Sequence, residues 1–136
     1  MAYYFEDHTA DIMIVIESNS LLSFFNDLLE ALWQIFLSKN EDQKQDFVEK
    51  KMEFQINFDN NEEFVFNFLS KYVYLLEVER FVMKEVEKVE IFQKNALFLV
   101  KGFWVKKIVS FIKAPTYHNF EVDFDGYYKC RVVLDV

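Results

Sequence analysis

The polar segment Asp7-His8-Thr9-Ala10-Asp11 stands directly before the apolar run Ile12-Met13-Ile14-Val15-Ile16. The run is rich in β-branched side chains and predicts a buried strand. A strand needs neither acids nor a histidine at its entrance, so the segment before it has two interpretations. It is either a polar turn that bonds its own backbone amides, or one wall of a pocket in which His8 and Asp11 meet residues from elsewhere in the chain.

Length and composition predict a single domain over residues 1–136, because 136 residues that are 52% hydrophobic can bury a core without disulfides or metals. The 17 Phe make that core aromatic, and the 2 Gly and 1 Pro leave no glycine-rich phosphate loop. The lone Cys130 excludes a disulfide framework and a cysteine-built zinc site. Its apolar surroundings in the sequence indicate a small core side chain.

The net charge of −8 disfavours direct binding of nucleic acid as the main activity, because an acidic surface repels phosphate backbones. Cations and basic protein surfaces are the expected partners. The N-terminal residues lack the basic and apolar regions of a signal peptide. Asp27 and Glu30 interrupt the most apolar segment, so no stretch is predicted to span a membrane. We expect a cytoplasmic protein.

Two segments have the spacing of amphipathic helices, residues 21–37 and residues 62–79. Ser18-Asn19-Ser20 offers caps for the first, and Asn60 with Glu63 three positions later predicts the start of the second. Residues 39–50 are polar and predict a solvated loop.

The strand predictions rest on alternation and on turn signals. Residues 52–58 alternate without error, residues 82–91 change phase and predict a bulge or turn near Lys88, and residues 96–100 and 107–112 read as further strands. Residues 120–124 and 127–136 flank Asp125-Gly126 and predict a final hairpin. Two amphipathic helices packed on a mostly antiparallel or mixed sheet make the fold class α+β.

Two later segments concentrate further polar chemistry. Lys113-Ala114-Pro115-Thr116-Tyr117-His118 carries a cation, the only Pro and the second of 2 His. The chain then ends in Val132-Val133-Leu134-Asp135-Val136, which puts a carboxylate beside the terminal α-carboxylate. Both segments are candidate partners for His8 and Asp11.

Taken in order from Tyr4 to the last residue, these segments resemble the archease family. His8-Thr9-Ala10-Asp11 matches the family's H-T-A-D motif, and residues 113–118 match K-A-V-T-Y-H with Pro115 in place of Val. The chain end at Leu134-Asp135-Val136 matches the family's closing L-D-(I/V).

The resemblance implies an archease-like α+β fold and a role beside an RNA ligase. Archeases assist the 3′-phosphate/5′-hydroxyl RNA ligase of tRNA splicing and RNA repair. They promote guanylylation of the ligase and its repeated turnover, and are not enzymes themselves. The resemblance therefore implies a tRNA-processing activator whose partner is that ligase.

The resemblance also implies a divalent-cation site. Carried onto this chain, the metal ligands are Asp11, Asp135 and Val136, with calcium expected first and magnesium or manganese as alternatives. Lys113, His8 and His118 fall in motif positions around that site, and no catalytic residue is implied. One departure is Ser70-Lys71, where the family has an acidic residue in the second helix.

The donor chemistry agrees independently with such a cation. Carboxylates and a terminal oxygen are hard donors, and three protein positions leave part of a calcium shell of roughly six to eight oxygens to water or a partner. Two other functions stay open. One is a metal-dependent hydrolase with His8 or His118 as base, which no nucleophile motif supports. The other is a chaperone-like interaction module with exposed Phe, which the regular spacing of the Phe residues disfavours.

Overall fold

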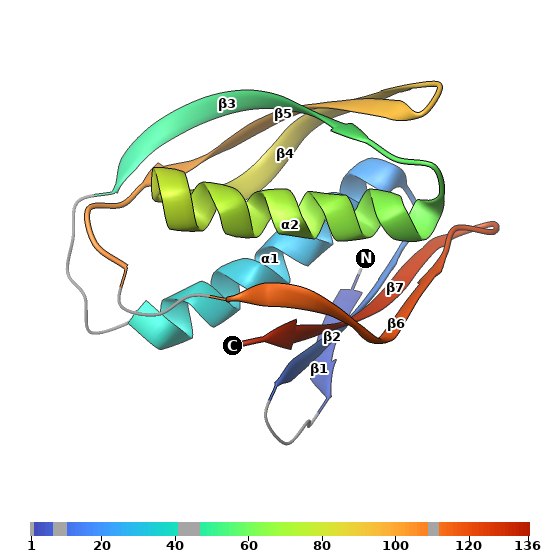
Figure 1. The fold of residues 1–136 in the computed structure, drawn as a ribbon, viewed down its shortest axis with the longest axis horizontal. Helices are drawn as coiled ribbons and strands as arrows, with labels where there is room; N and C mark the ends of the chain where they lie inside the picture. Colours follow the sequence, from blue (N-terminus) through green and yellow to red (C-terminus); the bar gives the residue numbers. More distant parts are fainter. Residues whose placement is uncertain (1, 7–10, 41–46, 109–111) are drawn as a thin grey trace.

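The computed structural model describes residues 2–6, 11–40, 47–108 and 112–136 (Figure 1). Its elements, in chain order, are β1 (Ala2–Glu6), β2 (Ile12–Ser18), α1 (Leu21–Asn40), β3 (Val48–Asn57), α2 (Asn61–Glu79), β4 (Phe81–Phe92), β5 (Asn95–Trp104), β6 (Ala114–Asp123) and β7 (Tyr128–Asp135).

The strands form two sheets, with the two helices between them (Figure 1). One sheet has the order β1-β2-β7-β6 and the other the order β3-β5-β4, and every pairing between these strands is antiparallel. α1 contacts β2 and β4, and α2 contacts β6, β3 and β4, so each helix touches both sheets. The predicted α+β class is confirmed. The division of the strands into two sheets was not predicted.

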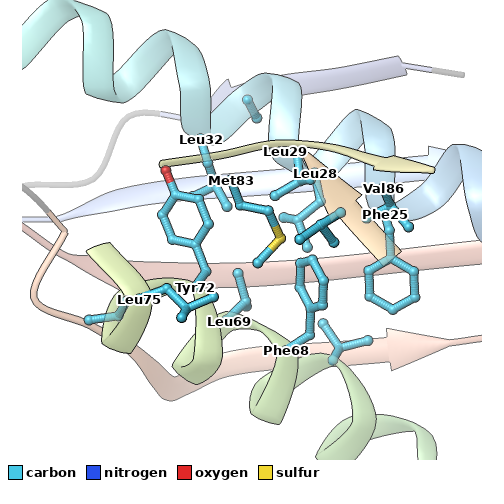
Figure 2. Packing of buried hydrophobic residues seen from close by; sticks show 14 of the residues in the cluster. Phe25, Leu28, Leu29, Leu32, Phe68, Leu69, Tyr72, Leu75, Met83 and Val86 are labelled. Carbon is cyan, nitrogen blue, oxygen red and sulfur yellow. The ribbon is translucent and has the colours of Figure 1, made fainter. Parts of the chain in front are cut away.

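The core between the sheets is built on phenylalanine, as the composition predicted. The ring of Phe25 lies 4.5 Å from Phe68, 5.0 Å from Phe98 and 5.3 Å from Phe64, measured between ring centroids. Figure 2 shows the facing side chains of α1 and α2 with Met83 of β4 between them. Burial of these rings removes apolar surface from water at about 25 cal/mol per Å², and edge-to-face pairs add to that gain.

The predicted helix starts are confirmed by their caps. Asn60 Oδ1 accepts a hydrogen bond from the Glu63 backbone N–H at 2.8 Å, and Ser20 Oγ accepts one from the Ser23 N–H at 3.1 Å. Each bond satisfies a backbone donor that the first turn of a helix leaves without a partner. α2 ends at Glu79, and the left-handed φ of 54° at the next residue, Arg80, stops the helix.

The phase change predicted near Lys88 is a bulge and not a turn, because β4 continues to Phe92. Its pairing with β5 shifts register twice, between Met83 and Glu85 and between Val86 and Lys88. The hairpin after residues 120–124 is also confirmed. Gly126 at its tip has a φ of 82°, a value that glycine adopts without strain.

Two sequence predictions need correction, and one strand was missed. The strand predicted over residues 107–112 is wrong for its described residues, because Lys107, Ile108 and Ile112 lie outside every strand. Ile112 is buried and Ile108 packs against the core, so the apolar character of this run comes from packing and not from strand pairing. The loop predicted over residues 39–50 is shorter than expected, because α1 reaches Asn40 and β3 begins at Val48. β1 was not predicted.

Within the described ranges, no helix is long and apolar enough to cross a bilayer.

Candidate functional site

Strand β7, which carries the C-terminal motif, lies inside the four-stranded sheet between β2 and β6 (Figure 1). β2 begins directly after Asp11, and β6 begins directly after Lys113. Both neighbours run antiparallel to β7, so their first residues meet its last ones. The start of β2, the start of β6 and the end of β7 therefore lie side by side at one end of this sheet.

The strand register fixes how these segments meet. Leu134 pairs with Ile12 on one side and with Pro115 on the other. One residue further along, Asp135 pairs with Ala114, and Asp11 comes directly before Ile12, the residue that pairs with Leu134. The Lys113 backbone N–H donates a hydrogen bond to the Asp135 carbonyl oxygen at 2.8 Å. The main chain thus joins the second motif directly to the third.

The side chains at this edge alternate between the core and the outer face of the sheet. Leu134 is buried in the core, so the Asp135 side chain leaves on the opposite face. Asp11, Asp135 and Val136 are each partly exposed, and Lys113 is exposed. The side chain of Val136 packs against the core, which holds the end of the chain in place. Solvent or a partner can therefore reach the carboxylates.

The donor set at this edge fits a hard divalent cation in type. The candidates are the carboxylates of Asp11 and Asp135 and the terminal carboxylate of Val136, all of them oxygen donors of the kind that calcium, magnesium and manganese prefer. In the part of the chain that the structure describes, no three side chains of His, Cys, Asp or Glu gather as a metal site. His8 lies outside the described residues.

His118 lies in an irregular part of β6 and not beside Asp135. Thr116 pairs with Val133 and Glu121 pairs with Arg131, so β6 carries extra residues over this stretch. Asn119 in the middle has a left-handed φ of 55°, and His118 is exposed. The register therefore brings Asp11, Lys113 and Asp135 together and sets His118 further along the same strand.

The two departures from the family pattern have different consequences. Pro115 is buried on β6, which is an edge strand, so its missing N–H breaks no ladder between two neighbours. Lys71 lies on the other side of the molecule, where its Nζ is 5.6 Å from the ring centroid of Phe54 on β3. Position 71 is thus beside the three-stranded sheet and away from Asp135.

Sequence reasoning missed one aromatic contact near the second motif. The ring of Tyr117 stacks on Phe66 of α2, with 3.9 Å between centroids and 7° between planes, and Phe120 packs edge-on against both. The available signal was Phe66 itself, since it falls outside the apolar stripe of its helix. This stack holds the irregular segment of β6 against α2.

Comparison with known proteins agrees with the three motifs. Residues 3–136 match the model of the Archease protein family (MTH1598/TM1083). The chain belongs to the archease family. It is also 27% identical over 141 residues to Protein archease of Pyrococcus abyssi, an alignment that covers 96% of this chain and 95% of that protein. The resemblance that the motifs indicated is therefore confirmed.

Two solved structures have the same fold. One is a crystal structure from Thermotoga maritima of an archease described as a possible chaperone, with a TM-score of 0.55, 24% identity, and coverage of 96% of this chain and 94% of that one. The other is the solution structure of Methanobacterium thermoautotrophicum protein 1598, with a TM-score of 0.65, 17% identity and 98% coverage of both chains. At these identities the likeness supports the fold alone.

Proposed function

We propose that this chain activates an RNA ligase of the 3′-phosphate/5′-hydroxyl type in tRNA splicing and RNA repair. It promotes guanylylation of the ligase and its repeated turnover. The observation that carries the proposal is that β2 and β6, which begin directly after Asp11 and Lys113, flank the end of β7 at Asp135, where the Lys113 N–H donates to the Asp135 carbonyl at 2.8 Å. Family membership supports a shared role.

The proposal includes a divalent-cation site made by Asp11, Asp135 and Val136, with calcium first and magnesium or manganese as alternatives. When bound, the cation would supply positive charge for the oxygens of a phosphate group. The chain's own residues would act by position. The pairing of β2 with β7 would keep Asp11 near Asp135, and the main-chain bond from Lys113 would fix the backbone of Asp135. The remaining coordination positions stay available to water or to the ligase.

A role as activator, not as enzyme, is supported by what the sequence lacks and by its charge. No phosphate-cradling loop or nucleophile motif accompanies the site. The charge of −8 suits a partner with a basic, RNA-binding surface, because opposite charges speed association. We propose that both proteins meet in the cytoplasm.

Ligase turnover tests the proposal. The protein is added in substoichiometric and equal amounts to its cognate ligase with GTP, RNA ends and a divalent metal, and the ligase–guanylate intermediate and joined RNA are followed with time. Wild-type protein should speed formation of the intermediate and allow many ligations per ligase. Asp11→Asn and Asp135→Asn should lower this stimulation by about tenfold or more, because each removes one charged donor.

Asp125→Asn is the matched control, since Asp125 is an exposed carboxylate at the opposite end of the β6–β7 hairpin. It should stimulate like the wild type. Calorimetric titration with Ca²⁺ and Mn²⁺ separates the cation site from ligase activation. Full stimulation by both aspartate variants would refute the site. GTP hydrolysis by the protein alone would favour the metal-dependent hydrolase instead.

A further inference from the structure

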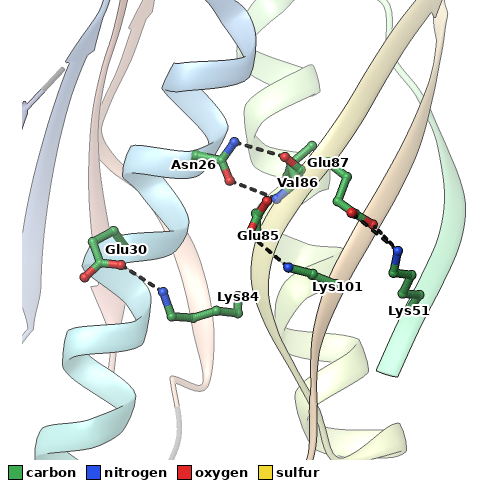
Figure 3. A network of polar contacts seen from close by, with 8 residues as sticks. All are labelled: Asn26, Glu30, Lys51, Lys84, Glu85, Val86, Glu87 and Lys101. Atoms are coloured by element: carbon green, nitrogen blue, oxygen red, sulfur yellow. Dashed lines mark hydrogen bonds and ion pairs between the residues drawn. The ribbon is translucent and has the colours of Figure 1, made fainter. Parts of the chain in front are cut away.

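The two edges of the three-stranded sheet differ in how they are protected. On the β4 edge, the side chain of Asn26 bonds both the N–H and the C=O of Val86, and two bulges break the regular edge (Figure 3). On the other edge, β3 pairs with β5 from Val48 to Asn57 without a register shift. β3 is therefore a long and regular edge strand, the kind that can accept another strand.

The outer edge of β3 has backbone groups available for pairing. In an antiparallel pair, every second residue directs its N–H and C=O away from the partner strand. Within the described parts of the chain, no hydrogen bond reaches the outward backbone groups of residues 50–56. Only at the end of the strand does Asn57 accept a bond, from the Asn67 side chain at 3.0 Å.

An open, shallow groove lies beside the last three residues of this edge, with α2 as its other wall. It has a volume of about 400 Å³ and is lined by residues 55–57 of β3 and by Asn67, Ser70, Lys71 and Tyr74 of α2. Most of these side chains can donate a hydrogen bond, and Lys71 carries a positive charge. The amides and hydroxyls also accept hydrogen bonds, so the lining suits a polar ligand, and Lys71 favours a negative charge on it.

Lys71 is held in place without a counter-ion. Its Nζ lies 5.6 Å from the ring centroid of Phe54 and 5.2 Å from that of Tyr74, within the range of cation–π attraction. Among the residues that the structure describes, no carboxylate forms an ion pair with it. In a chain with a net charge of −8, an unpaired cation in a groove is a specific feature that can select an anion.

We propose that this groove binds an extended peptide segment of a partner protein, which adds to β3 as a further strand and sets an acidic side chain against Lys71. Backbone hydrogen bonds to the β3 edge supply affinity, and the alternation of side chains points every second residue of the peptide toward α2. The groove belongs to the three-stranded sheet, whereas the archease motifs meet on the other sheet. The inference thus adds a second contact surface and does not depend on the proposed function.

Peptide binding followed by NMR tests this inference. The ¹⁵N-labelled protein is titrated with a pool of blocked heptapeptides that have a central glutamate and Thr, Val or Ile at the other positions. The amide signals of β3 and of residues 67–74 should shift. Affinity should fall about tenfold when glutamine replaces the central glutamate, and by a similar factor in Lys71→Gln, because one charge-assisted contact is lost.

The controls separate strand addition from general attraction. Lys51→Gln removes a charge from β3 itself, but Lys51 is 3.4 Å from Glu87 of β4 and not in the groove, so binding should be unchanged. Lys71→Arg keeps the charge and should bind, which excludes misfolding as the cause of a loss. Two peptide sets are methylated on backbone nitrogens in opposite alternation, and the set that blocks the N–H groups facing β3 should not bind. The proposal is refuted by a pool that shifts no β3 signal, by methylated peptides that bind equally, or by equal losses in Lys51→Gln and Lys71→Gln.

Discussion

Two strands, β4 and β6, carry extra residues relative to their neighbours, and they differ in how far other side chains contact those residues. In β4, the residues at the register shifts are engaged by neighbours: Lys84 Nζ is 3.0 Å from a Glu30 carboxylate oxygen on α1, and Glu87 is 3.4 Å from Lys51 on β3 (Figure 3). In β6, the extra stretch between Thr116 and Glu121 leaves Tyr117 and His118 exposed.

The irregular part of β4 has a structural role, whereas the irregular part of β6 displays side chains at the surface. Glu30 on α1 faces the irregular part of β4. Hydrogen bonds from Gln34 of the same helix and from Lys84 of β4 hold the pKa of Glu30 below its ordinary value, so this carboxylate stays charged for its ion pair. Beside the bulge, a Cβ at Gly102 would collide with the Val82 carbonyl oxygen, so only glycine fits. On β6, the irregular stretch holds part of a family motif at the surface. The irregular part of β4 is held by side chains of α1 and β3, whereas the irregular part of β6 leaves its side chains accessible at the surface.

The largest expected effect comes from opening the closed bulge. Asn26→Ala removes both bonds to Val86, which is 1% exposed, and leaves a buried N–H and C=O without partners. The free energy of unfolding should fall by about 2–3 kcal/mol, measured by urea denaturation. Gln34→Ala, on the exposed side of the same helix, should change it by less than about 0.5 kcal/mol. Equal effects of the two substitutions would mean that the Asn26 bonds do not close the bulge.

The next effect tests whether β7 stays buried next to the open bulge of β6. Burial raises the pKa of the Cys130 thiol from 9.0 to about 12. In the unfolded chain the thiol ionises first, so its stabilising contribution is complete below pH 9 and declines between pH 9 and 12. The decline is about 1.4 kcal/mol per pH unit. The free energy of unfolding, measured by urea denaturation at several alkaline pH values, should fall as pH rises. Cys130→Ala should make this fall less steep by about 1.4 kcal/mol per pH unit. An unchanged slope would mean that solvent reaches Cys130.

The smallest expected effect concerns the anchor of the open bulge. Phe66→Ala removes the ring that stacks on Tyr117 at 3.9 Å and should lower the free energy of unfolding by about 1 kcal/mol. Tyr117→Phe keeps the stack and should be neutral, because Tyr117 is 66% exposed. Hydrogen exchange of residues 116–121 should accelerate in Phe66→Ala alone. Unaltered exchange there would show that the stack does not hold the segment.

Local patterns in the sequence predicted most of the elements. Helix periodicity, the Asn60 cap and the turn at Gly126 each depend on neighbours within a few residues, and all three are confirmed. The motifs were also sufficient to identify the family, because motif order is a property of the chain alone. The apolar pattern gave a wrong prediction over residues 107–112. Residues 107–112 are apolar because Ile108 and Ile112 pack on the core, and periodicity does not distinguish such a run from a strand.

The tertiary structure alone decided which segments meet. The sequence marked Asp11, Lys113 and Asp135 as candidates, but only the pairing of β2 and β6 with β7 brings them to one edge. The same pairing sets His118 further along β6, and the division into two sheets leaves β3 as an open edge beside Lys71. The physical reason is that helix and turn signals are local, whereas strand partners are chosen by the packing of residues far apart in the chain.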